Sequence, residues 1–230
     1  MRSGPRSGTT NSHPSEPILE TKAKRMLQPW PQTTKRAVFL DRDGVLNDLE
    51  YNREEGRIGS PLSSNQLRVV PHAGETVRNI RALGYEAILA SNQPGVAKRQ
   101  ITHNEFERMN HKVRDDLAKH RTFLDAEYFC LHHPEALIPK YRLDCDCRKP
   151  KPGLLIRAAE ERGIALGASF FVGDALADVK AGRAAGCKTI LLGHVTTFLT
   201  AMIERESARP DFMLATFREV PDLLRRLAIQ

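Results

Sequence analysis

Two carboxylates stand close together in the segment Phe39-Leu40-Asp41-Arg42-Asp43-Gly44, directly after a short apolar run. Two carboxylates at a strand end can converge on one Mg²⁺ ion, because this cation prefers oxygen ligands. The cation would neutralise the oxygens of a phosphate ester, which otherwise repel an attacking anion. One aspartate could then form an acyl phosphate while the other moves protons for the leaving group and for water. Read alone, the pair is equally compatible with a polar turn.

Two later segments offer groups that could stabilise a transferring phosphoryl group. Ser91 follows the apolar run at 87–90, and its hydroxyl could donate to a phosphoryl oxygen. Arg148 and Lys149 open a basic segment, in which Lys149 could supply an ammonium and Lys151 is a competing candidate. The ordinary alternatives are a turn serine and a solvated basic loop.

A third segment, Val172-Gly173-Asp174, again ends an apolar run with a carboxylate, which could be a further magnesium ligand. Asp178 lies one helical turn further on and could orient the site from behind the ligands. A helix N-cap with a neighbouring acid would look the same. Because each weak motif falls at the edge of an expected strand or helix, their combination indicates a phosphate site.

Cysteine and histidine side chains occur in two closely spaced pairs, Cys130-Leu131-His132 and Cys145-Asp146-Cys147. Thiolate and imidazole groups in this spacing form the halves of a tetrahedral zinc site. With Cys130, His132, Cys145 and Cys147 as ligands, the set is that of a closed structural site, and His133 is the rival for the histidine ligand. Because Cys147 directly precedes the basic segment, zinc would hold the loop that carries Lys149. Incidental buried cysteines are the alternative, and a small core residue is the expectation for Cys187.

Alternating apolar runs and amphipathic stretches predict an α/β fold with a doubly wound, mainly parallel sheet. Strands are expected at 37–40, 87–90, 128–131, 170–172 and 189–192, and helices at about 73–83, 103–119, 153–163, 177–185 and 217–228. The chemistry-bearing residues follow the carboxyl ends of these strands, where such sheets bind ligands. The long segment at 48–70 is expected to be a flap or loop over the site.

Charge is distributed unevenly along the 230 residues. Residues 1–36 contain seven basic and two acidic side chains and so hold most of the net charge of +7. We expect residues 1–35 to be a disordered basic leader and 36–230 to be a single domain with a zinc loop at about 130–147. The nearly balanced domain argues against nucleic-acid binding, and apolar runs long enough for a signal peptide or membrane span are absent. A cytoplasmic protein is therefore expected, with a monomer favoured.

The four phosphate-site motifs resemble those of the haloacid-dehalogenase (HAD) superfamily over residues 37–193. The resemblance implies a three-layer Rossmann-type fold and a Mg²⁺-dependent phosphatase that works through an aspartyl phosphate. It implies Asp41 as nucleophile, Asp43 as acid/base, Ser91 and Lys149 as further catalytic groups, Asp41, Asp43 and Asp174 as magnesium ligands, and Asp178 behind them.

The zinc pairs followed by Arg-Lys-Pro resemble a narrower branch, which has no large cap domain and contains heptose bisphosphate and histidinol-phosphate phosphatases. This resemblance implies a small sugar phosphate as substrate, bound by Asn92 and Gln93, with Arg148 suited to a second phosphate because of its planar fork. Ala175 and the long 48–70 segment depart from the branch and leave the substrate open. Histidinol phosphate is the alternative substrate. Phosphate transfer to a sugar hydroxyl and a catalytically silent binding protein on the same fold are the alternative functions.

Overall fold

The computed structural model describes residues 1, 35–53 and 56–229. Nearly all of the predicted leader, residues 1–35, lies outside these described residues. Residues Thr33–Gln230 form one compact unit, which carries every element discussed below.

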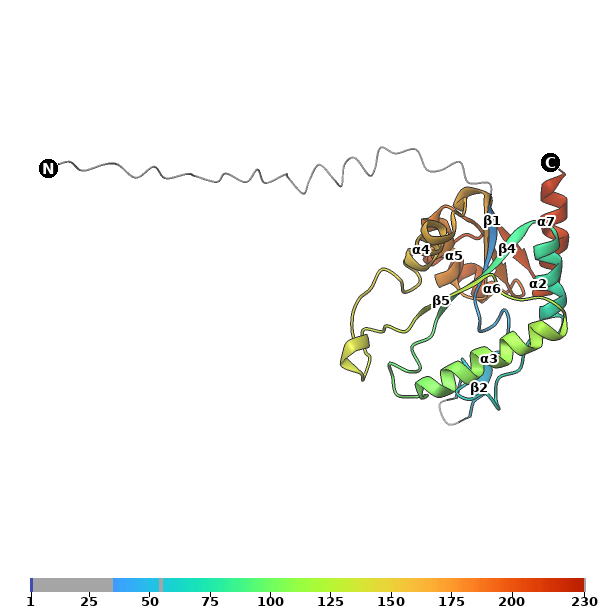
Figure 1. Ribbon diagram of the computed structural model, residues 1–230. Helices are drawn as coiled ribbons and strands as arrows, with labels where there is room; N and C mark the ends of the chain where they lie inside the picture. Colours follow the sequence, from blue (N-terminus) through green and yellow to red (C-terminus); the bar gives the residue numbers. More distant parts are fainter. Residues whose placement is uncertain (2–34, 54–55, 230) are drawn as a thin grey trace. The chain divides into compact units, whose positions relative to one another are not determined.

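Six parallel strands form the central sheet (Figure 1). In spatial order they are β5 (Ala126–Cys130), β4 (Tyr85–Asn92), β1 (Arg36–Leu40), β6 (Phe170–Gly173), β7 (Lys188–Leu192) and β8 (Phe212–Leu214). The chain moves from β1 outward to β4 and β5, and then returns to the other side of β1 for β6, β7 and β8. The order therefore reverses beside β1, and side chains just beyond the carboxyl ends of β1, β4 and β6 are brought together.

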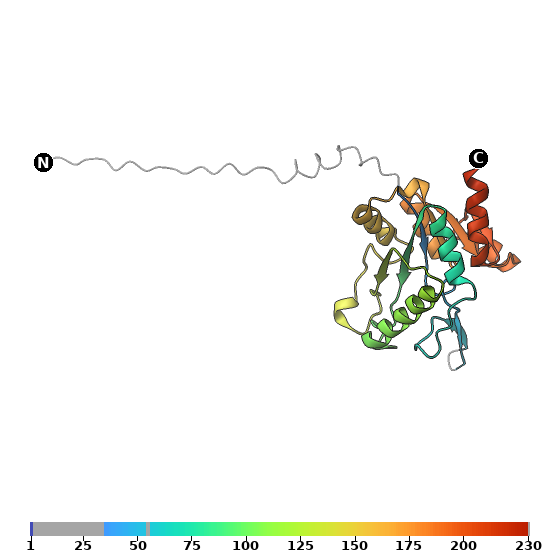
Figure 2. The same ribbon diagram turned by 45° about the vertical axis from the view of Figure 1, so that its right-hand side comes forward.

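Helices cover both faces of the sheet (Figure 2), because the inner strands are apolar on both sides. Val38 and Leu40 of β1 face one core, and Ala37 and Phe39 face the other. The first core is completed by α2 (Ala73–Ala82), α3 (His103–Lys119) and α7 (Val220–Ala228), and the second by α4 (Gly153–Arg162) and α5 (Leu176–Ala185). The predicted doubly wound α/β class is confirmed.

The predicted strands and helices are present; the helix predicted at 103–119 has those bounds, and the bounds of the others shift by at most three residues. Two elements near the end of the chain were not predicted, namely α6 (Thr197–Arg205) and β8. The predicted helix at 217–228 begins as a 3₁₀ turn, Phe217–Glu219, and becomes α-helical at Val220. None of the helices in the described part of the chain has both the length and the apolar character that a membrane span requires.

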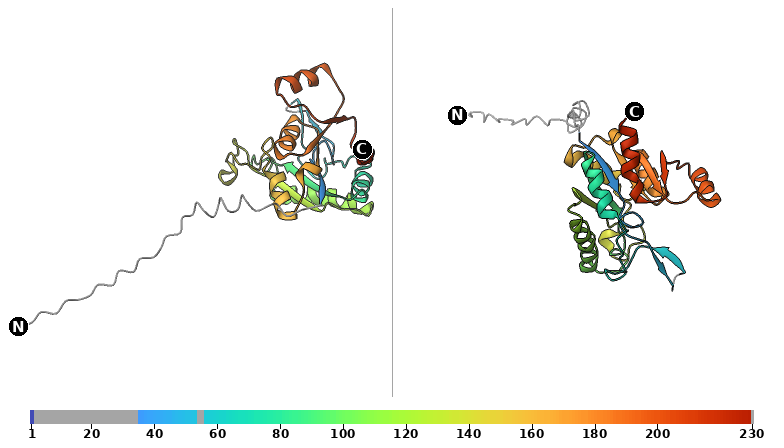
Figure 3. Two further views of the ribbon diagram at one scale, coloured as in Figure 1. Left: turned by 90° about the horizontal axis from the view of Figure 1, so that it is seen from above. Right: turned by 90° about the vertical axis from the view of Figure 1, so that its right-hand side faces the viewer.

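The segment at 48–70 contains a small antiparallel hairpin, formed by β2 (Glu50–Asn52) and β3 (Arg57–Gly59). Figure 3 shows this hairpin, in light blue, projecting away from the sheet. The chain then returns to the domain, where Leu67 is fully buried and Val69 bridges to Asn47. Over the described residues, this hairpin and its return loop are the insertion after β1, and no large cap domain is seen there.

Candidate active site

Three carboxylates converge beyond the ends of β1 and β6. One oxygen from each of Asp41, Asp174 and Asp178 lies within 4.8 Å of the others. Asp41 is placed by the sheet itself, since its backbone N–H donates to Val172 O at 3.0 Å. Asp178 is fixed at the start of α5, where its Oδ2 accepts from the backbone N–H of Ala175 at 3.1 Å.

Gly44 allows this convergence, because no larger residue fits at its position. Its φ of +78° lies in the left-handed region, and an added Cβ would stand 2.1 Å from Asp174 Oδ2. The glycine therefore turns the chain after Asp43 and also leaves space for the Asp174 carboxylate.

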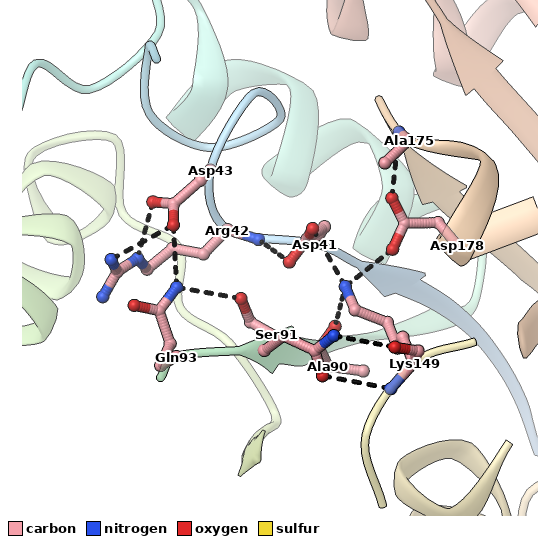
Figure 4. A network of polar contacts seen from close by, with 10 residues as sticks. Asp41, Arg42, Asp43, Ala90, Ser91, Gln93, Lys149, Ala175 and Asp178 are labelled. Carbon is pink, nitrogen blue, oxygen red and sulfur yellow. Dashed lines mark hydrogen bonds and ion pairs between the residues drawn. The ribbon is translucent and has the colours of Figure 1, made fainter. Parts of the chain in front are cut away.

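Lys149 supplies the positive charge of the site (Figure 4). Its Nζ lies 2.9 Å from Asp41 Oδ2 and 2.7 Å from Asp178 Oδ1, and it donates to Ala90 O at 3.0 Å. The side chain is buried, which disfavours its charge, but the two carboxylates outweigh burial and raise the pKa of Lys149. The predicted ammonium thus lies beside the predicted nucleophile.

One ammonium does not balance three carboxylates. Burial and the nearby charges of Asp178 and Asp41 raise the pKa of Asp174 to about 7. Burial, despite the attraction of Lys149, also raises the pKa of Asp178 to about 6. Like charges held together in a partly desolvated place are what a divalent cation would neutralise. The oxygen donors fit Mg²⁺.

Asp43, the predicted acid/base, faces away from this carboxylate cluster (Figure 4). Its Oδ2 accepts from Gln93 Nε2 at 2.8 Å, and Arg42 Nε donates to its Oδ1 at 3.1 Å. The side chain of Ser60, in the return loop after β3, also lowers the pKa of this carboxyl. Burial opposes ionisation, but the adjacent guanidinium and these hydrogen bonds outweigh it, so the pKa of Asp43 lies below its ordinary value. The third carboxylate beside Asp41 and Asp174 is therefore that of Asp178. The sequence analysis expected Asp43 in this place, as a magnesium ligand.

The polar residues after β4 have distinct partners. The Ser91 hydroxyl is buried and accepts from Gln93 Nε2 at 3.1 Å, so one amide connects it to Asp43. Asn92 bonds the backbone of Lys149 twice, by donating from Nδ2 to its O and accepting at Oδ1 from its N, both at 3.1 Å. Asn92 and Gln93, expected to bind substrate, are thus occupied in positioning Lys149 and Asp43 in this structure.

The predicted zinc ligands Cys130, His132, Cys145 and Cys147 form one cluster. Their sulfurs are 3.1–3.5 Å apart, and His132 Nδ1 lies 3.3 Å from Cys147 Sγ and 3.8 Å from Cys130 Sγ. A tetrahedron with Zn–S bonds of ~2.3 Å has sulfurs about 3.8 Å apart, so a small expansion would admit the ion. The rival, His133, instead accepts from the backbone N–H of Glu135 through Nδ1 at 3.1 Å. The donor set fits zinc.

The loop that carries Cys145 and Cys147, the cysteine loop, continues directly into Arg148 and Lys149. Arg148 Nη1 donates to His132 O at 3.2 Å, which ties the guanidinium to the other half of the cluster. The backbone N–H of Gly153, at the start of α4, donates to Asp146 O at 3.0 Å. Lys149 is therefore held between the cluster, α4 and the end of β4. Its competitor Lys151 lies 2.7 Å from Asp144, away from the phosphate site.

Two functional candidates were missed by sequence reasoning, namely Arg42 and Asn110. Arg42 is fully buried against Asp43, and its Nη1 donates to Asn110 Oδ1 of α3 at 3.0 Å. An arginine between two aspartates, two residues after an apolar strand run, was a visible signal for the first. Asn110 gave no signal, because its contact joins residues 68 positions apart.

Comparison with known proteins agrees with this geometry. The HAD-hydrolase-like family model matches residues 146–220. The D-glycero-beta-D-manno-heptose-1,7-bisphosphate 7-phosphatase of Pasteurella multocida is 34% identical over 84% of this chain and 98% of its own length. The enzyme of the same name from Escherichia coli strain K12 is 32% identical over 83% of this chain and 94% of its own.

Solved structures show the same fold. A protein described as a HAD-like phosphatase from Mesorhizobium loti is 27% identical, with a TM-score of 0.68 over 88% of this chain and 90% of its own. A D,D-heptose 1,7-bisphosphate phosphatase from B. bronchiseptica, complexed with magnesium and phosphate, has a TM-score of 0.68 at 24% identity. It covers 84% of this chain and 99% of its own.

The fold, the carboxylate site and these relatives define a phosphatase of the HAD class. The chain belongs to the HAD-like hydrolases, within the group that includes the heptose bisphosphate phosphatases, and is a phosphoric monoester hydrolase.

Proposed function

We propose that the chain hydrolyses a phosphate ester of a small sugar through an aspartyl phosphate on Asp41. The observation that carries this proposal is the placement of Asp41 against Lys149 and beside Asp174 and Asp178. An ammonium and a cation site around one carboxylate are what a nucleophile needs to approach an anionic phosphoryl group.

In the first step, an oxygen of Asp41 attacks phosphorus, the bond from phosphorus to the sugar oxygen breaks, and a proton from Asp43 neutralises that leaving oxygen. Lys149, which lies 2.9 Å from Asp41, would stabilise the phosphoryl oxygens by its charge, and Ser91 would do so by donating its hydroxyl proton. Asp41 then carries the phosphoryl group as an acyl phosphate, and the sugar alcohol leaves.

In the second step, Asp43 acts as a base. It takes a proton from water as the water oxygen attacks phosphorus, and the bond between phosphorus and Asp41 breaks. Inorganic phosphate is released, Asp41 is a free carboxylate again, and Asp43 regains the proton that it gave in the first step. The lowered pKa of Asp43 keeps it ionised at rest, so it must take up a proton before the first step.

Asp41 and Asp174 would hold Mg²⁺, and Asp178 would orient Lys149 behind them. Asp43 was predicted as a further ligand, but in this structure its carboxylate faces away from Asp41 and Asp174 and is bonded to Arg42 and Gln93. The ion, when bound, neutralises phosphoryl charge and so lowers the barrier to anionic attack. Zinc, held by Cys130, His132, Cys145 and Cys147, would fix the loop that presents Arg148 and Lys149.

The best candidate substrate is D-glycero-β-D-manno-heptose 1,7-bisphosphate, hydrolysed at the 7-phosphate. Relatives named for this activity match nearly their whole length. A cavity of about 590 Å³, lined in part by Ser60, Gln93 and Lys98, has room for the sugar, and Gln93 connects this cavity to Asp43. Arg148 would bind the second phosphate through its planar fork.

A phosphate-release assay over sugar phosphates, sugar bisphosphates and histidinol phosphate, with and without Mg²⁺, tests this proposal. We expect turnover of the heptose bisphosphate to exceed the others, to require Mg²⁺, and to be lost in Asp41→Asn. Activity of Asp41→Asn at the wild-type rate, or turnover without a divalent cation, would contradict the mechanism. Preference for histidinol phosphate would contradict the substrate alone.

A further inference from the structure

We propose that Arg42 is a positioning residue, which holds Asp43 in place and anchors it to helix α3 through Asn110. The inference rests on the proposed role of Asp43 as acid/base. It concerns a side chain that lies between the two aspartates in sequence and outside the carboxylate cluster in space.

Arg42 donates hydrogen bonds to both oxygens of the Asp43 carboxylate (Figure 4). Nε donates to Oδ1 at 3.1 Å, and Nη2 donates to Oδ2 at 3.4 Å. The remaining nitrogen, Nη1, donates to Asn110 Oδ1 at 3.0 Å. A forked pair of this kind fixes the plane of a carboxylate as well as its distance, which an ammonium cannot do.

The backbone of Arg42 is fixed as firmly as its side chain. Its carbonyl oxygen accepts from the backbone N–H groups of Leu46 at 2.8 Å and Asn47 at 3.0 Å, and its own N–H donates to Asp41 Oδ1 at 2.7 Å. The guanidinium is therefore a rigid support, and Asp43 cannot rotate without breaking two hydrogen bonds.

Stability alone is a weak reason for this arrangement. Buried ion pairs are often no more stabilising than apolar residues of the same volume. Asn110 adds a cost, because its buried Nδ2 has no hydrogen-bond partner among the described residues, and an unmet buried donor costs about 1–3 kcal/mol. Asn110 Oδ1 nevertheless accepts from Arg42, which points to a requirement for orientation.

Helix α3 also holds the loop that lies next to Asp43. Glu105 accepts from the backbone N–H of Ser64, and Lys112 Nζ donates to Ser64 O at 2.7 Å. Ser60, earlier in the same loop, lies close enough to Asp43 for its side chain to lower the pKa of the carboxyl. The helix is thus a common anchor for Asp43 and for the loop that, with Gln93, lines the cavity.

Misplacement of Asp43 should matter only when the leaving group needs a proton. A sugar alkoxide leaves poorly without one, whereas p-nitrophenolate is stable as an anion. Since kcat/KM reports the steps up to formation of the aspartyl phosphate, the ratio of kcat/KM for the two kinds of ester isolates the contribution of Asp43 as an acid. A general loss of folded protein or of site geometry lowers both values together.

The test compares Arg42→Lys, which keeps the charge but not the fork, and Asn110→Leu, which keeps the branched shape and the number of heavy atoms but not the acceptor. We expect kcat/KM for a sugar phosphate that the wild type hydrolyses to fall about 10- to 100-fold in Arg42→Lys, and less in Asn110→Leu. With p-nitrophenyl phosphate both variants should stay within about 3-fold of wild type, because general acid catalysis contributes little there.

Arg81→Lys is the matched control, since Arg81 makes an equally forked pair with Asp125, at 3.0 Å for both bonds, far from the site. Arg81→Lys should leave the ratio of kcat/KM for the two substrates unchanged. An equal loss on both substrates in the Arg42 and Asn110 variants would overturn the inference. Asp43→Asn tests the acid role of Asp43 separately from the positioning role of Arg42. If the ratio of kcat/KM for the aryl ester to that for the sugar phosphate is the same in Asp43→Asn as in the wild type, the proposed acid role of Asp43 is wrong. If Asp43→Asn loses more activity on the sugar phosphate than on the aryl ester and Arg42→Lys does not, the acid role stands and only the positioning role of Arg42 is wrong.

Discussion

At the scale of single residues, Gly44 has two properties that one substitution can separate. Its positive φ would strain any side chain by about 1–3 kcal/mol, and its missing Cβ leaves room for Asp174. Gly186 is a matched control, because its φ is +86° but nothing lies within 4 Å of an added Cβ. Both Gly→Ala variants should therefore lose stability, but only one should disturb the carboxylate cluster.

We expect Gly44→Ala to weaken the apparent affinity for Mg²⁺ at least about tenfold in activity titrations, since Asp174 must move. Gly186→Ala should lower the thermal midpoint and leave the Mg²⁺ titration unchanged. Equal titrations for Gly44→Ala and wild type would show that Asp174 does not hold the cation.

The polar residues of the site could be predicted from the sequence to the extent that they follow apolar strand runs. Asp41, Ser91 and Asp174 each end such a run, and parallel strands end at one edge of the sheet. The contact between Arg42 and Asn110 could not be predicted, because it depends on how α3 packs. The direction of the Asp43 carboxylate is likewise set by neighbours that are distant in sequence.

At the scale of elements, the length of an apolar run decides whether a strand or helix can be predicted from the sequence. Strands β1 and β4 have five and eight residues and are buried on both faces, so their apolar runs are easy to recognise. β8 has three half-buried residues, and α6 has no buried residue among those described. Short or exposed elements carry little periodicity, which is why they were missed.

The cysteine loop gives a prediction at this same scale. Cys145→Ser and Cys147→Ser should each lose most of the bound zinc, because a closed site needs all four of its donors. Turnover should fall about 10- to 100-fold with the loss of zinc, since the loop presents Lys149 to Asp41. Zinc content by atomic absorption and kcat on the same samples measure both effects.

Cys187→Ser is the control for that experiment. Cys187 is a buried thiol in the core between α5 and the sheet, outside the metal cluster. It should cost stability but leave the zinc content unchanged. Wild-type turnover in a zinc-free Cys147→Ser protein would show that the loop holds Lys149 without the ion.

At the scale of the whole molecule, the raised pKa values of the carboxylate cluster make the stability of the fold depend on pH. Burial and mutual repulsion raise the pKa of Asp174 to about 7, and burial raises that of Asp178 to about 6, both above the ordinary 3.8. Between about pH 4 and pH 7 the folded state therefore binds protons that the unfolded state has released. The contribution of these groups is fully present near pH 4 and is lost as the pH rises through 6 and 7. The lowered pKa of Asp43 affects the pH dependence of stability only below about pH 4.

Without Mg²⁺, the thermal midpoint should accordingly be several degrees higher at pH 5 than at pH 8. Saturating Mg²⁺ should raise the midpoint most at pH 8, where the cation replaces the missing protons, and so reduce the difference. Calorimetry in buffers that omit Mg²⁺ but contain no chelator measures this and leaves zinc in place. Asp174→Asn, which is neutral at every pH, should flatten the slope. If its slope equals that of the wild type, then Asp174 does not titrate in this range, and the competition between proton and cation is not located there.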